Sequence, residues 1–450
     1  MPSRSIVRRR ALAAAALLFA TIALSDAVAQ RPPPAEEPAT LIRAGRIFDS
    51  ERGVFVANRD VLVRGGRIER VGENLAAPAG ARTIDLRGHT LLPGLIDAHT
   101  HLLSLTDPRI GDTMEFTRML TLEGTPLRAL RGAARGRTWL EAGFTTVRDL
   151  GNSGRFGDFA LATAIEEGSV VGPRVFASGP GLSPYGGQLP GLVDAHHALA
   201  AEEYRIVRNP DDAAEAVREN VTHGARVIKI FSDNTPNRGS LSLEEMRAVV
   251  EAARRMNVPV AAHATGDAAI RRAVLAGVTT IEHGYDASDS TLRLMKERGV
   301  ALVPTDPDSV SVTWMVEAAP PTPAPTPAQI REYLETRPRD RLRRAMAAGV
   351  TIVAGSDMYV DVKRPQGQAA RRVLFAYRQA GMPTAAVLQS ATLHAARVLG
   401  DDRLGVIRPG AHADLVAVEG DLERDFGALE RVRFVMKAGK IYVGEGAATN

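Results

Sequence analysis

The stretch Leu91-Leu92-Pro93-Gly94-Leu95-Ile96-Asp97-Ala98-His99-Thr100-His101 is an apolar run that ends in two histidines. Such a run predicts a buried β-strand with a polar end. Side chains on a strand alternate in direction, so His99 and His101 point the same way. Both rings can therefore bind one metal ion through nitrogens at roughly 2.0 to 2.1 Å.

Four later segments repeat this pattern of a short apolar run that ends in a polar residue. They end at Lys229, His263, His283 and Asp357. A barrel of parallel strands brings strand ends from distant parts of a chain to one rim, and barrel enzymes carry their chemistry there. The joint occurrence of these residues predicts a metal site.

Strand and helix signals alternate through the middle of the chain, which indicates a parallel sheet. Ser242 and Glu245 form a capping box before a helix predicted over 244–256, and Asp267 is expected to cap a helix that stops at Gly277. We therefore expect an α/β fold, a (β/α)8 TIM barrel. Its eight predicted strands are the one that ends at His101 and those at 145–148, 174–178, 227–231, 258–263, 279–283, 300–304 and 351–356.

The two flanks of this block have the pattern of short β-strands separated by glycine turns. We predict strands at 40–48, 60–64, 67–71, 83–86, 414–418, 432–437 and 440–443, with tight turns at Gly65-Gly66 and Ala438-Gly439. The flanks should pack together as one small β-sandwich, for which a chain of 450 residues leaves room beside the barrel. The predicted boundaries are 1–29 for a signal peptide, 30–39 for a linker, 40–90 and 401–447 for the sandwich, and 91–400 for the barrel.

The N-terminus has the pattern of an export signal. Arg8-Arg9-Arg10 precede an apolar stretch over 11–23, which is shorter than the about 20 residues that span a bilayer, and Ala27-Val28-Ala29 offers a cleavage site. We expect a periplasmic or secreted protein that begins near Gln30 and has no stable membrane anchor, with an uncleaved anchor as the alternative. The arginines loosely resemble a twin-arginine signal, so the route of export stays open.

Charge and cysteine content limit the partners and the ligands. Most of the formal charge of +4 comes from the arginines of the export signal, so nucleic acid is not expected as a partner. The chain has no cysteine, which excludes disulfides and thiolate metal sites. A metal must therefore be bound through nitrogen and oxygen, a ligand set that fits zinc first and also suits manganese or cobalt.

Each candidate ligand has a second interpretation. A histidine at a strand end is often a hydrogen-bonded core residue, and Asp357 can cap the following helix instead of serving as an oxygen ligand or a proton acceptor. Lys229 lies between apolar residues, and burial lowers the pKa of a lysine. A neutral amine in such a place can add carbon dioxide and become a carbamate that bridges two cations; the alternative is a lysine that extends to solvent.

At this point the chain resembles the amidohydrolase superfamily, over essentially everything after residue 39. The resemblance rests on Pro93–His101, Ile228-Lys229-Ile230, Ala262-His263-Ala264, Ile281-Glu282-His283-Gly284 and Gly355-Ser356-Asp357. It implies two divalent metal ions, zinc first, with His99, His101 and Asp357 on one and His263 and His283 on the other. Carboxylated Lys229, formed with carbon dioxide, would bridge them.

Within that superfamily the chain is similar to a branch of Xaa-Pro dipeptidases, carboxypeptidase-like enzymes, ochratoxin-hydrolysing amidases and imidazolonepropionase-like proteins. The segments 140–149 and 277–284 carry this likeness, whereas the loop 231–236 lacks the double glycine of many dipeptide-cleaving relatives. The likeness implies a small amide or peptide-like substrate. Metal-activated water would attack the carbonyl, and Asp357 would pass a proton to the leaving nitrogen.

Loops on the same rim should supply specificity. Tyr185, Gln188, His196 and His197 follow the third predicted strand and are candidate substrate-binding residues, and the proline-rich stretch in 304–327 is expected to form an extended lid or a solvated insertion. The remaining histidines, at 89, 223, 394 and 412, are expected to be structural or on the surface.

Several functions stay open at this point. A binuclear amidase or dipeptidase leads, followed by a lactonase or ester hydrolase on the same metals and by a mononuclear deaminase, which would leave Lys229 without a role. A non-catalytic binding protein on a degenerate barrel is the alternative from a different class, but it should have lost ligands, and none is missing here. Neither the substrate nor the formation of a homo-oligomer is decided by the sequence.

Overall fold

The computed structural model describes residues 39–445, apart from residues 111, 190, 235–236 and 322. The predicted signal peptide with Arg8–Arg10 and Ala27–Ala29, the mature start near Gln30 and nearly all of the linker lie outside the described residues. Among the helices that are described, none is both long and apolar enough to cross a bilayer.

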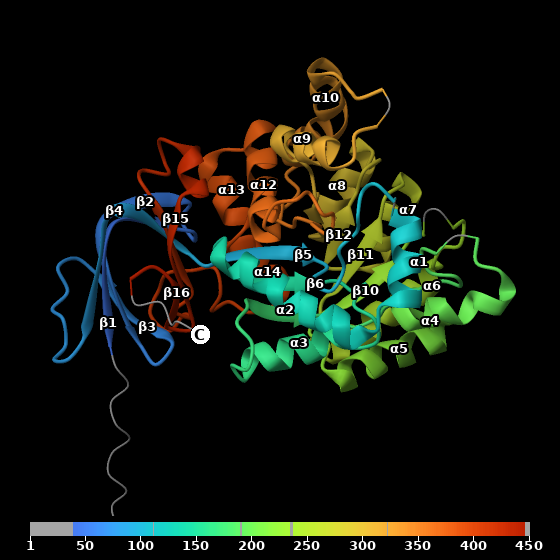
Figure 1. The fold of residues 1–450 in the computed structure, drawn as a ribbon, viewed down its shortest axis with the longest axis horizontal. Helices are drawn as coiled ribbons and strands as arrows, with labels where there is room; N and C mark the ends of the chain where they lie inside the picture. The colour runs from blue at the N-terminus through green and yellow to red at the C-terminus, as the bar shows by residue number, and fades with distance from the viewer. Residues whose placement is uncertain (1–38, 111, 190, 235–236, 322, 446–450) are drawn as a thin grey trace, which may run out of the picture. The chain divides into compact units, whose positions relative to one another are not determined.

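Strands from the two ends of the described chain share one seven-stranded mixed sheet, with the order β16-β15-β14-β4-β1-β2-β3. Figure 1 shows the blue N-terminal strands beside the red C-terminal ones. All the predicted flanking strands are present, and β2 and β4 are longer than expected. The bounds are β1 Thr40–Asp49, β2 Val54–Arg64, β3 Arg67–Gly72, β4 Arg82–Pro93, β14 Leu415–Glu419, β15 Val432–Lys437 and β16 Lys440–Val443.

Gly94 joins this mixed sheet to the first parallel strand. Its N–H donates to the Asp414 carbonyl at 2.7 Å, and a Cβ at this position would lie 2.0 Å from Thr145 Oγ1. Only glycine permits so close an approach. The Pro93-Gly94 step therefore lets the chain pass from β4 directly into the strand that carries His99.

The remaining strands are parallel and fall into a three-stranded sheet, β5-β6-β7, and a six-stranded sheet, β13-β12-β11-β10-β8-β9. The first seven predicted strands of the barrel are present. The bounds are β5 Leu95–Thr100, β6 Phe144–Asp149, β7 Arg174–Ala177, β8 Gly181–Ser183, β9 Tyr204–Ile206, β10 Ile228–Phe231, β11 Val260–Ala264, β12 Thr280–His283 and β13 Ala301–Val303.

The eighth predicted strand, at 351–356, is reduced to a single bridge between Ile352 and Leu302. Beyond the bridge, Ala354 N–H donates to the Ser390 carbonyl instead of to a strand. Asp357 then adopts a left-handed conformation with φ 52°, which no extended strand allows. The prediction of a regular strand was wrong here, although the chain direction is parallel as expected.

Helices fill the connections between the parallel strands and pack a large apolar core against them. The capping box of Ser242 and Glu245 is present, but the second predicted cap was wrong: Gly266 is the N-cap of that helix, and Asp267 accepts a hydrogen bond from Ser288 N–H. Gly277 ends the helix with φ 93°, as predicted. The α-helices are α1 Asp112–Leu122, α2 Thr125–Glu141, α3 Gly157–Glu166, α4 Ala200–Glu203, α5 Pro210–His223, α6 Leu243–Arg255, α7 Asp267–Ala276, α8 Asp289–Arg298, α9 Ser309–Ala318, α10 Pro327–Leu334, α11 Asp340–Ala347, α12 Gln366–Gln379, α13 Thr384–Ser390 and α14 Leu393–Leu399.

Candidate metal centre

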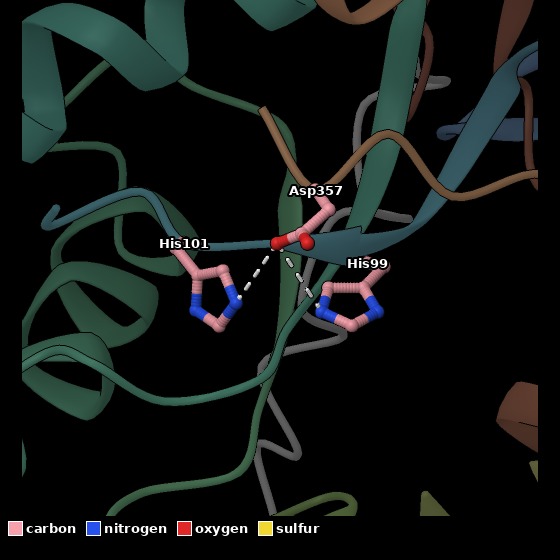
Figure 2. Close-up of side chains that lie close together, drawn as sticks. All are labelled: His99, His101 and Asp357. Atoms are coloured by element: carbon pink, nitrogen blue, oxygen red, sulfur yellow. Dashed lines mark ion pairs between the residues drawn. The ribbon is translucent and has the colours of Figure 1, made fainter. Parts of the chain in front are cut away.

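His99, His101 and Asp357 lie together at the carboxyl end of β5, and their ligand atoms are all within 4.8 Å of one another. Asp357 Oδ1 is 3.5 Å from His99 Nε2 and 3.2 Å from His101 Nε2. Figure 2 shows both rings turned toward this one carboxylate oxygen from either side. The three residues form a compact set of nitrogen and oxygen ligands, which suits a divalent metal.

The hydrogen bonds of the two rings fix which nitrogen is free. Nδ1 of His101 donates to the Gly151 carbonyl at 2.8 Å, and Nδ1 of His99 donates to Glu282 Oε2 at 2.7 Å. Both Nε2 atoms then carry lone pairs, and both face a carboxylate oxygen. His99 Nε2 and Asp357 Oδ1 are buried and lack a hydrogen-bond partner among the described residues. Either a proton on His101 Nε2 or a cation between the three groups would relieve the contact of these acceptors, so the site fits a metal ion.

Burial keeps the imidazole of His99 in the neutral form that binds metal. Burial, followed by the charge of Lys229, holds the pKa of His99 well below its ordinary value. Burial also opposes the charged form of His101, but the adjacent Asp357 carboxylate outweighs it and raises the pKa of this ring. A neutral imidazole is the metal-binding form. Asp357 itself has a lowered pKa: burial works against its charge, and His99, His101 and Lys229 prevail.

His263 and His283 continue the cluster. The ring centroids of His283 and His99 are 5.1 Å apart, and those of His283 and His263 are 4.8 Å apart. His283 Nδ1 lies 2.8 Å from Thr305 Oγ1, while Nε2 of His263 is buried without a hydrogen-bond partner in the described part of the chain. Burial, helped by Lys229, lowers the pKa of His263 to about 3. Four imidazoles from three strand ends therefore converge at one place.

Lys229 lies in the middle of β10 with 1% of its surface exposed. Burial lowers its pKa to about 8, and the carboxylates of Glu282 and Asp357 only partly oppose this effect. Its Nζ is 5.4 Å from the centroid of the Phe231 ring. The lowered pKa makes the uncharged amine more accessible near neutral pH than it is for an exposed lysine, as predicted from the apolar neighbours of Lys229.

Left-handed backbone conformations cluster around these residues. His283, Thr305 and Asp357 have φ values of 68°, 56° and 52°, although none of them is glycine. Such conformations cost about 1–3 kcal/mol each and persist only where the surroundings enforce them. At His283 the turn of the chain lets two consecutive side chains, Glu282 and His283, both reach the cluster.

Three buried residues that support the ligands were missed by the sequence analysis. Arg148 donates to Glu282 Oε1 at 2.8 Å, and Glu282 in turn holds His99. Asp97 accepts hydrogen bonds from Ser356 N–H at 2.9 Å and from the indole of Trp139 at 3.0 Å. Asp97 lies on the same face of its strand as His99 and His101, so the alternation of side chains along the strand could have indicated its role. No sequence pattern indicates the pairing of Arg148 with Glu282.

A cavity of about 560 Å³ opens beside the cluster, with His263 in its wall. It combines aromatic rings with charged groups, as small-molecule sites do. The predicted substrate-binding residues Tyr185, Gln188, His196 and His197 do not line it: Tyr185 is 66% exposed and stacks on His197 at 4.9 Å. The lining residues are His263, Thr265, Tyr285, Asp286, Asp306, Pro307, Tyr333, Arg337, Pro338 and Arg341.

Comparison with known proteins identifies the family to which a chain with this fold and these candidate ligands belongs. The sequence model described as "Amidohydrolase family" matches residues 90–442, and the chain belongs to this family. It is a metal-dependent hydrolase that acts on C–N bonds.

Individual relatives share most of their length with the chain. Ochratoxinase from Aspergillus niger is 28% identical over 443 residues, which cover 91% of this chain and 88% of that protein. A solved Xaa-Pro dipeptidase with bound methionine is 29% identical with a TM-score of 0.76, and covers 90% of this chain and 100% of its own. A prolidase complexed with N-methylphosphonate-L-proline is 30% identical with a TM-score of 0.77 and the same coverage.

Replacement of Glu282 by Gln should lower metal affinity without removing any ligand. The amide keeps the size of the carboxylate, but its NH₂ group can donate to His99 Nδ1 and shift the ring proton to Nε2, the nitrogen that faces Asp357. We expect affinity for the metal to fall about 10- to 100-fold, measured by metal analysis after dialysis against a buffered chelator. The exposed Glu297→Gln on α8 is the control, and an unchanged metal content in Glu282→Gln would contradict this role.

Proposed function

We propose that the chain is an exported binuclear metal hydrolase that cleaves a non-cyclic amide bond in a dipeptide or an N-acyl amino acid. The observation that carries the proposal is the buried cluster itself. It brings His99, His101, His263, His283, Lys229 and Asp357 together, and among the described residues it leaves ring nitrogens and a carboxylate oxygen without hydrogen-bond partners.

A closed (β/α)8 barrel is the framework we propose for this cluster. Arg226 N–H, two residues before β10, donates to the Ala177 carbonyl at the end of β7 at 3.0 Å, so the two parallel sheets adjoin there. At the other side, Leu302 forms the bridge to Ile352, and Ala98 N–H donates to the Ala354 carbonyl at 2.9 Å, which connects β13 through the eighth segment to β5. The mixed sheet encloses its own apolar core, which supports its description as a small sandwich.

We assign His99, His101 and Asp357 to one metal, His263 and His283 to the other, and a carbamate of Lys229 as the bridge between them. Zinc suits these nitrogen and oxygen donors first. When bound, such metals supply Lewis acidity and make water more acidic at neutral pH. The lowered pKa of Lys229 supports carbamate formation, because only the neutral amine can add carbon dioxide.

In this proposal the protein groups hold the substrate and move one proton. Asp357 takes a proton from the attacking water and gives it to the leaving nitrogen, which departs poorly unless protonated. The cavity beside His263 receives the side chains of the substrate, with Tyr285 and Tyr333 offering aromatic surface and Arg337 a positive charge. The prolidase, Xaa-Pro dipeptidase and ochratoxinase relatives support an amide substrate of this size.

Removal of the Lys229 side chain tests the binuclear site. Lys229→Ala should lose metal and amide hydrolysis together, because the bridge between the two ligand sets is gone, and short carboxylic acids in solution should partly restore both. We expect elemental analysis to give two metal ions per chain in the wild type and fewer in Lys229→Ala. Lys296→Ala, an exposed lysine on α8, is the matched control; full activity in Lys229→Ala would refute the bridge and leave a mononuclear centre.

Asp357→Asn separates the ligand role from the proton-transfer role and compares amide with ester hydrolysis. The amide side chain keeps one carbonyl oxygen but cannot accept a proton, so much of the metal should remain while amide hydrolysis falls about 10²- to 10⁴-fold. Activated esters and lactones should lose less, because their leaving oxygen needs no proton. The measurement is kcat/KM on dipeptides, N-acyl amino acids and lactones. Equal losses on all three would leave Asp357 as a ligand only, and a wild-type preference for lactones would favour a lactonase.

Export is proposed from the sequence pattern of the N-terminus. N-terminal sequencing of the protein from the periplasmic fraction or the medium should give a start near Gln30. A folded, active protein that retains Met1 would refute cleavage of a signal peptide.

A further inference from the structure

A second cavity, of about 500 Å³, lies away from the metal centre. It is formed by α3, the start of β7, the residues after α5 and the hairpin of β15 and β16. Arg174 is the first residue of β7, and Arg226 precedes β10 by two residues. The cavity is therefore at the amino ends of β7 and β10, whereas the metal centre lies at the carboxyl end of the parallel strand β5, and the proposed function has no use for this cavity.

Positive charge dominates the wall of this cavity. Arg174, Arg226, Lys437 and Lys440 line it, whereas Glu166 is the one carboxylate among its described lining residues. Within the described chain, neither Arg226 nor Lys440 forms an ion pair. Arg226 stacks its guanidinium face on the Phe176 ring at 3.7 Å, a contact that uses none of its N–H donors.

Lys437 is the unusual member of the group, because its charge is buried and no carboxylate of the described residues forms an ion pair with it. It is 9% exposed, and its Nζ donates to the Gly172 carbonyl at 2.5 Å. Burial, and then the charge of Arg174, lowers the pKa of Lys437 to about 8. Buried charges are ordinarily paired, but among the described residues no carboxylate forms an ion pair with this ammonium, and Asp414 only partly offsets the lowering of its pKa.

Arg174 adds a further unsatisfied donor. Its Nη2 pairs with Asp414 at 3.2 Å, but its Nε is buried and has no hydrogen-bond partner in the described structure. Donors thus exceed acceptors on one side of the cavity. The other side is apolar, with Phe159, Ile165 and Val175 in the wall and Tyr442 beside the lysines.

We propose that this cavity binds a small organic oxyanion, with its carboxylate or phosphate head on the basic residues and its apolar body against Phe159 and Ile165. The volume lies within the roughly 300–1,000 Å³ of small-molecule sites and leaves room for more than an inorganic ion. A negative head would place its charge beside Lys437, Arg226 and Lys440, none of which forms an ion pair among the described residues.

Calorimetry with phenyl phosphate, benzoate and inorganic phosphate tests the proposal on the metal-loaded protein at constant ionic strength. We expect an organic anion to bind, and the double variant Arg226→Gln/Lys440→Gln to weaken its binding about tenfold or more through the loss of two charged contacts. Both side chains are exposed, so the fold should be retained. Arg298→Gln, an exposed arginine on α8, is the matched control and should bind as the wild type does.

The outcomes distinguish the possible ligands. If phenyl phosphate binds more tightly than benzoate, the head group of the ligand is a phosphate. If benzoate binds more tightly than phenyl phosphate, the head group is a carboxylate. Inorganic phosphate that binds as tightly as phenyl phosphate would overturn the apolar part of the site. Absence of binding in the wild type, or equal binding in the double variant, would overturn the proposal.

Because metal centres also bind oxyanions, the position of the ligand needs a direct measurement. Crystals of the metal-loaded protein grown with 4-bromobenzoate or 4-bromophenyl phosphate should give an anomalous bromine signal between α3 and the β15–β16 hairpin. A signal confined to the metal centre would refute the second site. Amide hydrolysis by the double variant should equal that of the wild type, so failure here leaves the proposed function untouched.

Discussion

The buried ion pair between Arg148 and Glu282 connects three parallel strands just below the metal ligands. Arg148 donates to the Ala98 carbonyl of β5 at 2.5 Å and to Glu282 of β12 at 2.8 Å, and both charged side chains are fully buried. Removal of two charges from water costs several kcal/mol for each ion, so the pair is stable only if its partners stay in register. The position of His99, which Glu282 holds, depends on that register.

Other buried carboxylates act on the backbone beside the ligands. Asp149 Oδ2 accepts hydrogen bonds from Leu102 N–H at 2.6 Å and Thr100 Oγ1 at 3.1 Å, which orders the chain on either side of His101. Asp97 does the same for Ser356, the residue before Asp357. Burial raises the pKa of Asp97 to about 6, so its ionised form is held at a cost in stability. The buried carboxylate thus lowers the stability of the fold but fixes the position of the backbone that carries the ligands.

The sequence predicts strand ends well and the contacts between them poorly. The apolar runs before His99, Lys229, His263 and His283 correspond to β5, β10, β11 and β12, because a buried parallel strand needs such a run. The prediction of the eighth strand failed because the hydrogen bond from Ala354 to Ser390 joins segments that no local pattern relates. The roles of these residues as ligands stay predictions, although the structure brings them together.

Specificity is harder to predict than chemistry, and the cavity beside His263 shows why. Its wall contains Tyr333 and Arg337 from the helical segment after the proline-rich stretch, where no strand pattern constrains the chain. Tyr185 and His197, which were predicted to bind substrate, stack on each other and do not line this cavity. Ligands at strand ends are positioned by backbone hydrogen bonds of the sheet, whereas the cavity wall is positioned by loop packing. The same metal chemistry can therefore serve different amides when only the loops change.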